Sequence, residues 1–264
     1  MKSTLSLDKK YEFYERSVQY PEGEVEFMRD EFKRYFGRFP LTMREDFCGT
    51  GAISCDWVKH HKDAEAYGID LDPEPIEMGK KRHFSKLNPK QRERVHYLNE
   101  NVLKSSAPKT DVVCAFNFSY WIFKQRKDLL RYFKQVKKSL NKQGIFFLDL
   151  FGGPESQKLV TDQKKLEGLT YYWECQHFNP LNHECTFAIH FRDEKGKKHN
   201  NVFTYDWRFW TLPELRDILT EAGFSRVMTY WEDDDGEGGG NGEFYPTDEA
   251  ENCDAWVSYI AAIN

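Results

Sequence analysis

The stretch Glu45-Asp-Phe-Cys-Gly-Thr-Gly51 ends a predicted strand that starts at Leu41, and it leads into a predicted helix at residues 52–61. Glycines at such a strand-to-helix turn let the backbone approach a ligand closely and aim amide N–H groups at it. Asp70 ends the next predicted strand, 21 residues after Gly49 (70 − 49), where an acid can accept hydrogen bonds from both ribose hydroxyls. The combination predicts a site for an adenosine-type cofactor. The alternative is a tight turn with a helix-capping aspartate.

Strands and helices alternate on both sides of this turn. The apolar runs Val112-Val-Cys-Ala-Phe116 and Ile145-Phe-Phe-Leu-Asp-Leu150 predict strands buried on both faces, as in a parallel sheet. Apolar residues recur at helical spacing between residues 127 and 140, and Gly144 is expected to end that helix. Strands are predicted at 41–47, 64–70, 95–98, 112–116, 145–150, 227–231 and 253–263, and helices at 52–61, 73–87, 127–140 and 211–222. This pattern predicts an α/β fold with an open, doubly wound, mostly parallel seven-stranded sheet.

Two stretches interrupt the alternation. Residues 169–205 are rich in Thr, Tyr, Phe and His, with turn signals at Asn179-Pro180 and Asp193-Glu-Lys-Gly196. They predict antiparallel hairpins inserted after the fifth strand. Residues 232–242 contain five glycines and five acids, which predicts an irregular loop between the last two strands that is placed to serve as a lid.

The composition excludes several classes of protein. The 264 residues include 38 basic and 43 acidic side chains, a net charge of −5, so no surface built mainly to grip nucleic acid is expected. No apolar run is long enough to span a bilayer, and the first ten residues lack the apolar core of a secretory signal. The six cysteines form no Cys-x-x-Cys pair, which favours free thiols in the cytoplasm.

Four motifs in order resemble the class I S-adenosylmethionine-dependent methyltransferases. Glu45-x-Phe47-x-Gly49-x-Gly51 is similar to their first motif, with Phe47 where the family usually has its first glycine. Ala66-Tyr-Gly-Ile-Asp-Leu-Asp-Pro73, Leu98-Asn-Glu-Asn-Val-Leu103 and Asp111-Val-Val-Cys-Ala-Phe-Asn-Phe-Ser-Tyr-Trp121 resemble the next three. A dinucleotide fingerprint would instead place Gly or Ala at Ser54, so an NAD enzyme is disfavoured.

The resemblance implies a Rossmann-like methyltransferase fold whose last strand is antiparallel, and S-adenosylmethionine as cofactor with S-adenosylhomocysteine as product. It places Asp70 on the ribose, Asn101 on the exocyclic amine of adenine and the Val102 N–H on the ring. The full set of expected cofactor-binding residues is Tyr14, Glu45, Phe47, Gly49, Gly51, Asp70, Leu71, Asn101, Val102 and Asn117. No metal is expected, because the sulfonium is itself activated.

The segment after the fourth strand supplies the expected catalytic residues. In Asn117-Phe-Ser-Tyr120 both ends match the Asn/Asp-Pro-Pro-Tyr/Phe of some amine-methylating relatives, in which the first residue orients the nitrogen. The alternatives are a turn-forming Asn117 and a packing Tyr120. Trp121, Tyr205 and Arg208 are expected to contact the substrate, with Arg208 receiving a carboxylate. Their alternative is a place in the core.

The hairpin insertion and the N-terminal tyrosines resemble small-molecule enzymes of the glycine and sarcosine N-methyltransferase kind. We therefore expect one methyltransferase domain over residues 1–264, a helical cover at 1–37 and a substrate cap at 165–206. The expected function is methyl transfer to a small molecule, preferentially at an amine nitrogen, by in-line displacement. A protein or RNA substrate and a non-catalytic S-adenosylmethionine-binding module remain alternatives.

Two segments contain residue types that bind metal ions. Cys175, His177, His183 and Cys185 are symmetric about position 180, so a regular hairpin would place them opposite one another on one face, a composition that can bind zinc. Their spacing is not that of a zinc knuckle, which favours ordinary half-buried strand residues. The acidic run from Asp233 has Phe244 at its twelfth position, where a calcium loop requires Glu.

Overall fold

The structure, a computed structural model, describes residues 5–234, 236 and 240–264. The helices are α1 (Leu7–Val18), α2 (Pro21–Phe36), α3 (Ala52–Trp57), α4 (Pro73–Arg82), α5 (Pro89–Arg92), α6 (Arg126–Ser139) and α7 (Leu212–Glu221). The strands are β1 (Thr42–Asp46), β2 (Glu65–Asp70), β3 (Val95–Asn99), β4 (Thr110–Ala115), β5 (Leu140–Gly152), β6 (Thr161–Leu166), β7 (Leu169–Phe178), β8 (Glu184–Asp193), β9 (Lys198–Arg208), β10 (Arg226–Asp234), β11 (Gly240–Pro246) and β12 (Trp256–Ile263).

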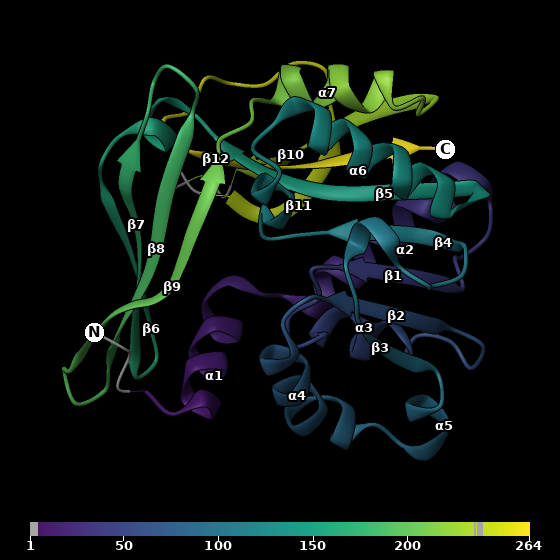
Figure 1. Cartoon of the computed structure of the whole chain (residues 1–264), viewed down its shortest axis with the longest axis horizontal. Coiled ribbons are helices and arrows are strands. Elements are labelled where there is room, and N and C mark those ends of the chain that lie inside the picture. The colour runs from purple at the N-terminus through teal and green to yellow at the C-terminus, as the bar shows by residue number, and fades with distance from the viewer. Residues whose placement is uncertain (1–4, 235, 237–239) are drawn as a thin grey trace.

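The central sheet has the strand order β11-β10-β12-β5-β4-β1-β2-β3 (Figure 1). The pairs β1–β2, β2–β3, β1–β4 and β4–β5 are parallel, whereas β12 is antiparallel to both β5 and β10. Strand order reverses between β1 and β4, so the ends of these two strands border the crevice in which doubly wound folds bind ligands. The predicted doubly wound sheet with an antiparallel last strand is confirmed.

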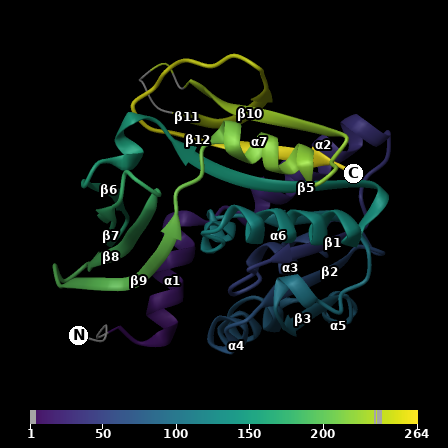
Figure 2. The same cartoon turned by 45° about the horizontal axis from the view of Figure 1, so that its top comes forward.

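Helices cover both faces of this sheet because its strands are apolar on both sides. On one face Phe133 of α6 and Leu215 of α7 pack with Val113 and Phe146 in one core cluster. On the other, the residues of α2 and α3 pack with the alternate strand residues, such as Val112. In Figure 2, α7 lies beside β12 and α6 lies along the other side of the β5 ribbon. The central strands β1 and β4 are therefore packed between two layers of helices.

Residues 161–208 form a separate antiparallel sheet of order β6-β7-β8-β9, called the wing below. Helix α1 lies between the wing and α4 in both views (Figures 1 and 2). Phe13 of α1 is buried against Phe191 and Ile189 of the wing. The chain thus carries its first helix across the carboxyl edge of the parallel strands.

Three local predictions were wrong. Helix α6 ends without a glycine cap, because Leu140 is already extended and starts β5, so residues 141–144 lie in the strand. Residues 73–87 do not form one helix, since α4 ends at Arg82 and a 3-10 turn follows. The expected loop at 232–242 is largely strand: β10 runs to Asp234 and pairs with β11, which makes the sheet eight-stranded. Residues 235 and 237–239 of that expected lid lie outside the described residues.

The Cys/His hairpin also differs from the symmetric prediction. Cys175 pairs with Phe187 and Cys185 with Phe178, because a register shift lies between Cys175 and His177. Both cysteines are buried in the core. In the part of the chain that the structure describes, no group of three or more His, Cys, Asp or Glu is placed to hold a metal ion. In the same part of the chain, no helix has both the length and the apolar character needed to cross a bilayer.

Candidate active site

The glycine turn between β1 and α3 is shaped by positive backbone φ angles. Phe47, Gly49 and Gly51 have φ of 58°, 54° and 63°. Phe47 therefore has a backbone conformation that is energetically unfavourable for any residue with a side chain. This explains why related motifs use glycine at that position. A Cβ on Gly49 would meet no atom within 4 Å, so this residue faces open space. A backbone open at this point can lie directly against a ligand.

Buried carboxylates hold the turn in place. Glu45 accepts hydrogen bonds from the backbone N–H of Ser54 at 2.9 Å and from its hydroxyl at 2.5 Å, which caps the start of α3. Burial raises the pKa of Glu45 to about 7 against these two bonds. Asp70 accepts the N–H of Gly49 at 2.8 Å and that of Asp72 at 2.9 Å. Its pKa is raised, chiefly by burial.

A cavity of about 320 Å³ lies above this turn and is called the turn cavity. It brings together residues from β1, the turn, β2, the end of β4, α1 and the wing. Its lining includes the predicted site residues Tyr14, Glu45, Phe47, Gly49, Asp70, Asn117 and Tyr205. Lys10, Tyr11, Gln19 and Phe203 complete the side formed by α1 and β9. Helix α1 therefore covers the glycine turn.

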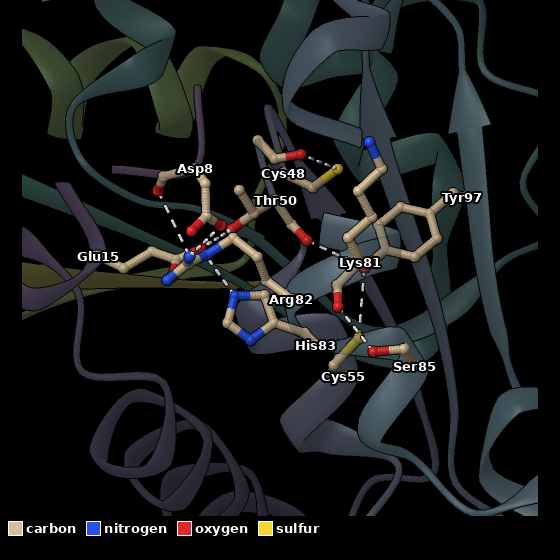
Figure 3. Close-up of polar contacts among 11 residues, drawn as sticks. Asp8, Glu15, Cys48, Thr50, Cys55, Lys81, Arg82, His83, Ser85 and Tyr97 are labelled. Carbon is tan, nitrogen blue, oxygen red and sulfur yellow. Dashed lines mark hydrogen bonds and ion pairs between the residues drawn. The ribbon is translucent and has the colours of Figure 1, made fainter. Parts of the chain in front are cut away.

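An ion-pair cluster fixes α1 to α4 (Figure 3). Glu15 accepts hydrogen bonds from Arg82 at 2.9 Å, from His83 at 2.7 Å and from the Thr50 hydroxyl at 2.8 Å. Asp8 binds the same guanidinium at 2.9 Å. Burial raises the pKa of Glu15, but the bonds from His83, Arg82 and Thr50 outweigh it, and the net pKa lies below the ordinary value. Because Thr50 is in the glycine turn, the cluster joins α1, α4 and that turn.

A second cavity, of about 520 Å³, is called the aromatic cavity. Its walls come from α1, α2, the end of β5, the wing and β12. Its aromatic lining consists of Tyr14, Phe118, Phe151, Tyr171, Trp173, Tyr205, Trp207, Trp256 and Tyr259. Its acidic lining consists of Glu24, Asp149 and Glu232, and no Lys, Arg or His lines it among the described residues. A cavity with π-faces and carboxylates suits a cation.

The two cavities share one wall. Tyr14, Asn117, Tyr205 and Trp207 line both. The hydroxyls of Tyr14 and Tyr205 are hydrogen-bonded to each other, and Tyr205 stacks on Trp207 with ring centroids 4.3 Å apart. Burial raises the pKa of both tyrosines, so both hydroxyls are neutral at physiological pH. A chemical group transferred between molecules bound in the two cavities would pass between these four shared residues.

Several predicted site residues do not line either cavity. Tyr120 is fully buried and donates its hydroxyl to the Asp149 carbonyl at 2.7 Å, and Trp121 packs among Phe151, Trp207 and Phe209. Both therefore correspond to the packing alternative rather than to a catalytic or substrate-contacting role. The guanidinium of Arg208 stacks on Trp210 at 3.8 Å and donates to Glu214, and Arg208 lines neither cavity.

Four further predicted cofactor-binding residues, among them the two expected adenine contacts Asn101 and Val102, do not line the turn cavity. Asn101 follows β3, and its side-chain oxygen accepts the N–H of Leu103 at 2.9 Å. Val102 is buried beside it, and Leu71 is 69% exposed. Gly51 is turned toward Tyr97, whose ring a Cβ would meet at 2.5 Å, and does not line the turn cavity. None of these four residues is in the lining of the turn cavity.

Sequence patterns missed two buried acids. Glu24 lies in the first turn of α2 and Asp149 in β5, and each is 7% exposed. Burial raises the pKa of Glu24 to about 8, with a further contribution from the charge of Asp149, and raises that of Asp149 to about 7. A Glu in the first turn of a helix is ordinarily a solvent-exposed residue. Asp149 interrupts the apolar run 145–150, and this acid within a buried strand was the one sequence feature that could have indicated a functional residue.

Comparisons with known proteins agree with this geometry. Residues 48–146 match the family model described as a methyltransferase domain, and no curated protein matches the chain. A similar solved structure is an S-adenosylmethionine-dependent methyltransferase from Clostridium acetobutylicum, at 16% identity and TM-score 0.68 over 97% of this chain and 98% of that one.

Two further similar structures are methyltransferases of sugars. CalS10, an amino pentose methyltransferase from Micromonospora echinaspora, is 12% identical, with TM-score 0.66 over 100% of both chains. The sugar N-methyltransferase KedS8 from Streptoalloteichus is 15% identical, with TM-score 0.63 over 96% of this chain and 92% of that one. At these identities the likeness concerns the fold. The segment that matches the methyltransferase-domain model, residues 48–146, includes Gly49, Gly51, Asp70 and Asn117.

Proposed function

We propose that this enzyme moves a methyl group from S-adenosylmethionine to an amine nitrogen of a small molecule. The turn cavity holds the cofactor and the aromatic cavity holds the acceptor. The observation that carries the proposal is the shared wall of Tyr14, Asn117, Tyr205 and Trp207 between the two cavities. Methyl transfer by displacement needs donor and acceptor in line and in contact, which two joined cavities provide.

The residues of the turn cavity fit the cofactor. Asp70 retains lone pairs for the ribose hydroxyls, since each oxygen accepts one backbone N–H and a carboxylate oxygen can accept two. Gly49 leaves open space for the ligand at the turn. When bound, S-adenosylmethionine supplies an activated methyl group on a cationic sulfonium. Aromatic faces such as those of Tyr14 and Trp207 stabilise a cation, and the cover formed by α1 excludes water.

The acceptor cavity favours nitrogen over other acceptor atoms. Amines are cations at neutral pH, and this cavity contains three acids, no base and nine aromatic side chains among its described residues. Two of the similar structures are a sugar N-methyltransferase and an amino pentose methyltransferase, which supports a nitrogen acceptor. Asn117, which lines both cavities, is the candidate for orienting that nitrogen through its side-chain oxygen.

Cofactor binding tests the first half of the proposal. Isothermal titration calorimetry of S-adenosylmethionine is expected to show affinity about tenfold or more weaker in Asp70→Ala, because charge-assisted hydrogen bonds are lost. Asp63→Ala changes an exposed acid in the loop before β2 and serves as the control. Unchanged affinity in Asp70→Ala contradicts the ribose assignment.

Turnover tests the second half. The protein is incubated with methyl-labelled cofactor and with cell extract separated into small-molecule, protein and RNA fractions. We expect multiple-turnover formation of S-adenosylhomocysteine with the small-molecule fraction, and label on nitrogen by mass spectrometry. Label found only in protein or RNA contradicts a small-molecule acceptor, and label on oxygen or carbon contradicts the amine.

A further inference from the structure

Glu24 presents an unpartnered carboxylate oxygen inside the aromatic cavity. The residue lies in the first turn of α2, is 7% exposed and lines that cavity. Its Oε2 is buried and has no hydrogen-bond partner among the described residues. Burying a carboxylate oxygen without a donor is costly, so a protein keeps one where a ligand supplies the missing donor.

Among the described residues that line the aromatic cavity, no Lys, Arg or His supplies this donor. The titratable groups that face it from the elements around it are Tyr14 of α1, Glu45 of β1, Cys114 of β4, Asp149 of β5, Tyr171 and Tyr205 of the wing, Glu232 of β10 and Tyr259 of β12. All are neutral or negative. The charges of Asp149 and Glu45 therefore repel an ionised Glu24 and attract any cation that enters.

The other two acids of the cavity are already engaged. Both oxygens of Asp149 accept backbone N–H groups, of Asn117 and of Phe118. Glu232 is half-buried at the outer strand β10, and its Oε1 accepts the N–H of Gly242 at 2.9 Å. Glu24 is thus the acid of the aromatic cavity that combines full burial with a free oxygen.

We propose that Glu24 is a catalytic residue that binds the ammonium form of the acceptor amine and takes one proton from it. This inference rests on the proposed function. In the step, an N–H bond of the ammonium breaks and an O–H bond forms on Oε2. The electron pair stays on nitrogen, which becomes a neutral amine, and the carboxylate becomes a neutral acid. That lone pair is what the methyl group must meet, because an ammonium has none to donate.

The acidity of the site suits this role. A general base works best when its pKa is near the operating pH, and burial raises the pKa of Glu24 to about 8. The carboxyl group can therefore hold a proton while the amine stays neutral, and above pH 8 it returns to the carboxylate once product has left. A glutamate at its ordinary pKa would be too weak a base to retain that proton.

Ligand binding tests the ammonium site without turnover. Three amines, benzylamine, cyclohexylamine and glucosamine, are titrated against their alcohols, benzyl alcohol, cyclohexanol and glucose, with and without S-adenosylhomocysteine. Tryptophan fluorescence reports binding, because Trp173, Trp207 and Trp256 line the cavity. We expect at least one amine to bind about tenfold or more tightly than its alcohol, and Glu24→Gln to abolish that preference. The proposal fails if no amine is preferred, or if Glu24→Gln retains the preference.

Proton counting tests the transfer itself. Calorimetry at pH 7 in two buffers of different ionisation enthalpy gives the number of protons released when the preferred amine binds. Before binding at pH 7 Glu24 is mostly protonated, and pairing with the ammonium displaces that proton to solvent and leaves the carboxylate, which then takes a proton from the amine. We therefore expect about one proton released by the wild type and none by Glu24→Gln. Equal release by both proteins overturns the assignment to Glu24.

Matched variants separate a catalytic from a structural effect. Glu22→Gln changes an exposed acid in the same helical turn and is expected to behave as wild type. Glu24→Gln is expected to bind S-adenosylhomocysteine normally but to lose about 10²-fold or more in kcat/KM, with loss of the pH dependence near pH 8 and partial rescue by Glu24→Asp. Unchanged kcat/KM and pH profile contradict this inference, whereas absent cofactor binding by the wild type contradicts the proposed function instead.

Discussion

The carboxylate of Asp149 holds the backbone of Asn117. Its Oδ2 accepts the Asn117 N–H at 2.8 Å, and its Oδ1 accepts the N–H of Phe118 at 2.9 Å. Asn117 and Phe118 have φ of 56° and 55°. This left-handed conformation is energetically unfavourable for residues with side chains. One buried acid on β5 thus stabilises a strained turn after β4, and that turn places Asn117 in the wall between the two cavities.

Replacing Asp149 tests this support. Asp149→Ala removes both acceptors and leaves two backbone donors without partners. We expect the free energy of unfolding to fall by about 1–3 kcal/mol, measured by urea denaturation, and methyl transfer to fall with it. Asp30→Ala, at an exposed position on α2, should stay within about 0.5 kcal/mol of wild type. An unchanged urea midpoint for Asp149→Ala would show that the turn does not need the carboxylate.

The ion-pair cluster predicts how firmly α1 covers the turn cavity. Glu15→Gln removes the charge that binds Arg82 and His83. We expect faster trypsin cleavage within α1 and weaker cofactor binding by calorimetry, because α1 opens more often. Glu12→Gln is the matched control, since Glu12 makes an exposed pair with Arg16 at 3.6 Å, a kind of pair that contributes little. Equal cleavage rates in the two variants would mean that apolar packing alone holds α1.

Gly79 marks a close backbone contact between α4 and the glycine turn. A Cβ at Gly79 would lie 1.9 Å from the carbonyl oxygen of Thr50, so α4 would have to shift. We expect Gly79→Ala to lower the free energy of unfolding by about 1–3 kcal/mol in urea and to weaken cofactor binding, since Thr50 lines the turn cavity.

Gly23 in α2 provides the control for that substitution. There a Cβ would meet the ring of Tyr20, but this side chain is 68% exposed and free to rotate away. Alanine favours a helix over glycine by up to about 1 kcal/mol, so Gly23→Ala is expected to be neutral or stabilising. The interpretation of Gly79 is wrong if both variants unfold at the same urea concentration.

The raised pKa of Glu24 predicts a dependence of stability on pH. The folded protein binds this proton up to about pH 8, whereas the unfolded chain loses it near the ordinary value of 4.5. The unfolded state therefore binds fewer protons between these limits, and the contribution of Glu24 to stability falls as pH rises through this window.

Glu24→Gln removes that contribution. We expect the melting temperatures of variant and wild type to agree near pH 4, where Glu24 is protonated in the folded protein and largely protonated in the unfolded chain, and the variant to melt at a higher temperature at pH 8.5. Differential scanning calorimetry across this range checks the prediction, with Glu22→Gln as control. A wild type that melts at the higher temperature at pH 8.5 would show that Glu24 has found a donor in the folded protein.

Much of the fold was predictable because it follows from local patterns. The runs at 112–116 and 145–150 are apolar without alternation, which requires burial on both faces. The capping box Thr211–Glu214 marked the start of α7, and both of its reciprocal bonds are present. The strand β11 escaped prediction because a glycine-rich acidic segment has low strand propensity, and only pairing with β10 makes it a strand.

The candidate site was less predictable. The spacing of Gly49 and Asp70 predicted that they lie together, and in the structure the Gly49 N–H donates to Asp70 and both residues line the turn cavity. Their role in binding a cofactor stays a prediction. From the sequence alone, Arg208 was expected to bind a substrate carboxylate. In the structure its guanidinium instead contacts Trp210 and Glu214, and no sequence pattern indicates these two contacts. Glu24 was missed because nothing in a helical first turn distinguishes a buried acid from an exposed one.

The sequence by itself determined the order of strands and helices, the glycine turn and the acid that follows it, since these depend on residues close together in the chain. The tertiary structure alone decided that α1, α2 and the wing meet over the end of β5. That meeting buries Glu24 with Asp149 and joins two cavities through Tyr14, Asn117, Tyr205 and Trp207. Burial and its effect on charge arise from segments distant in sequence, and no local pattern records them.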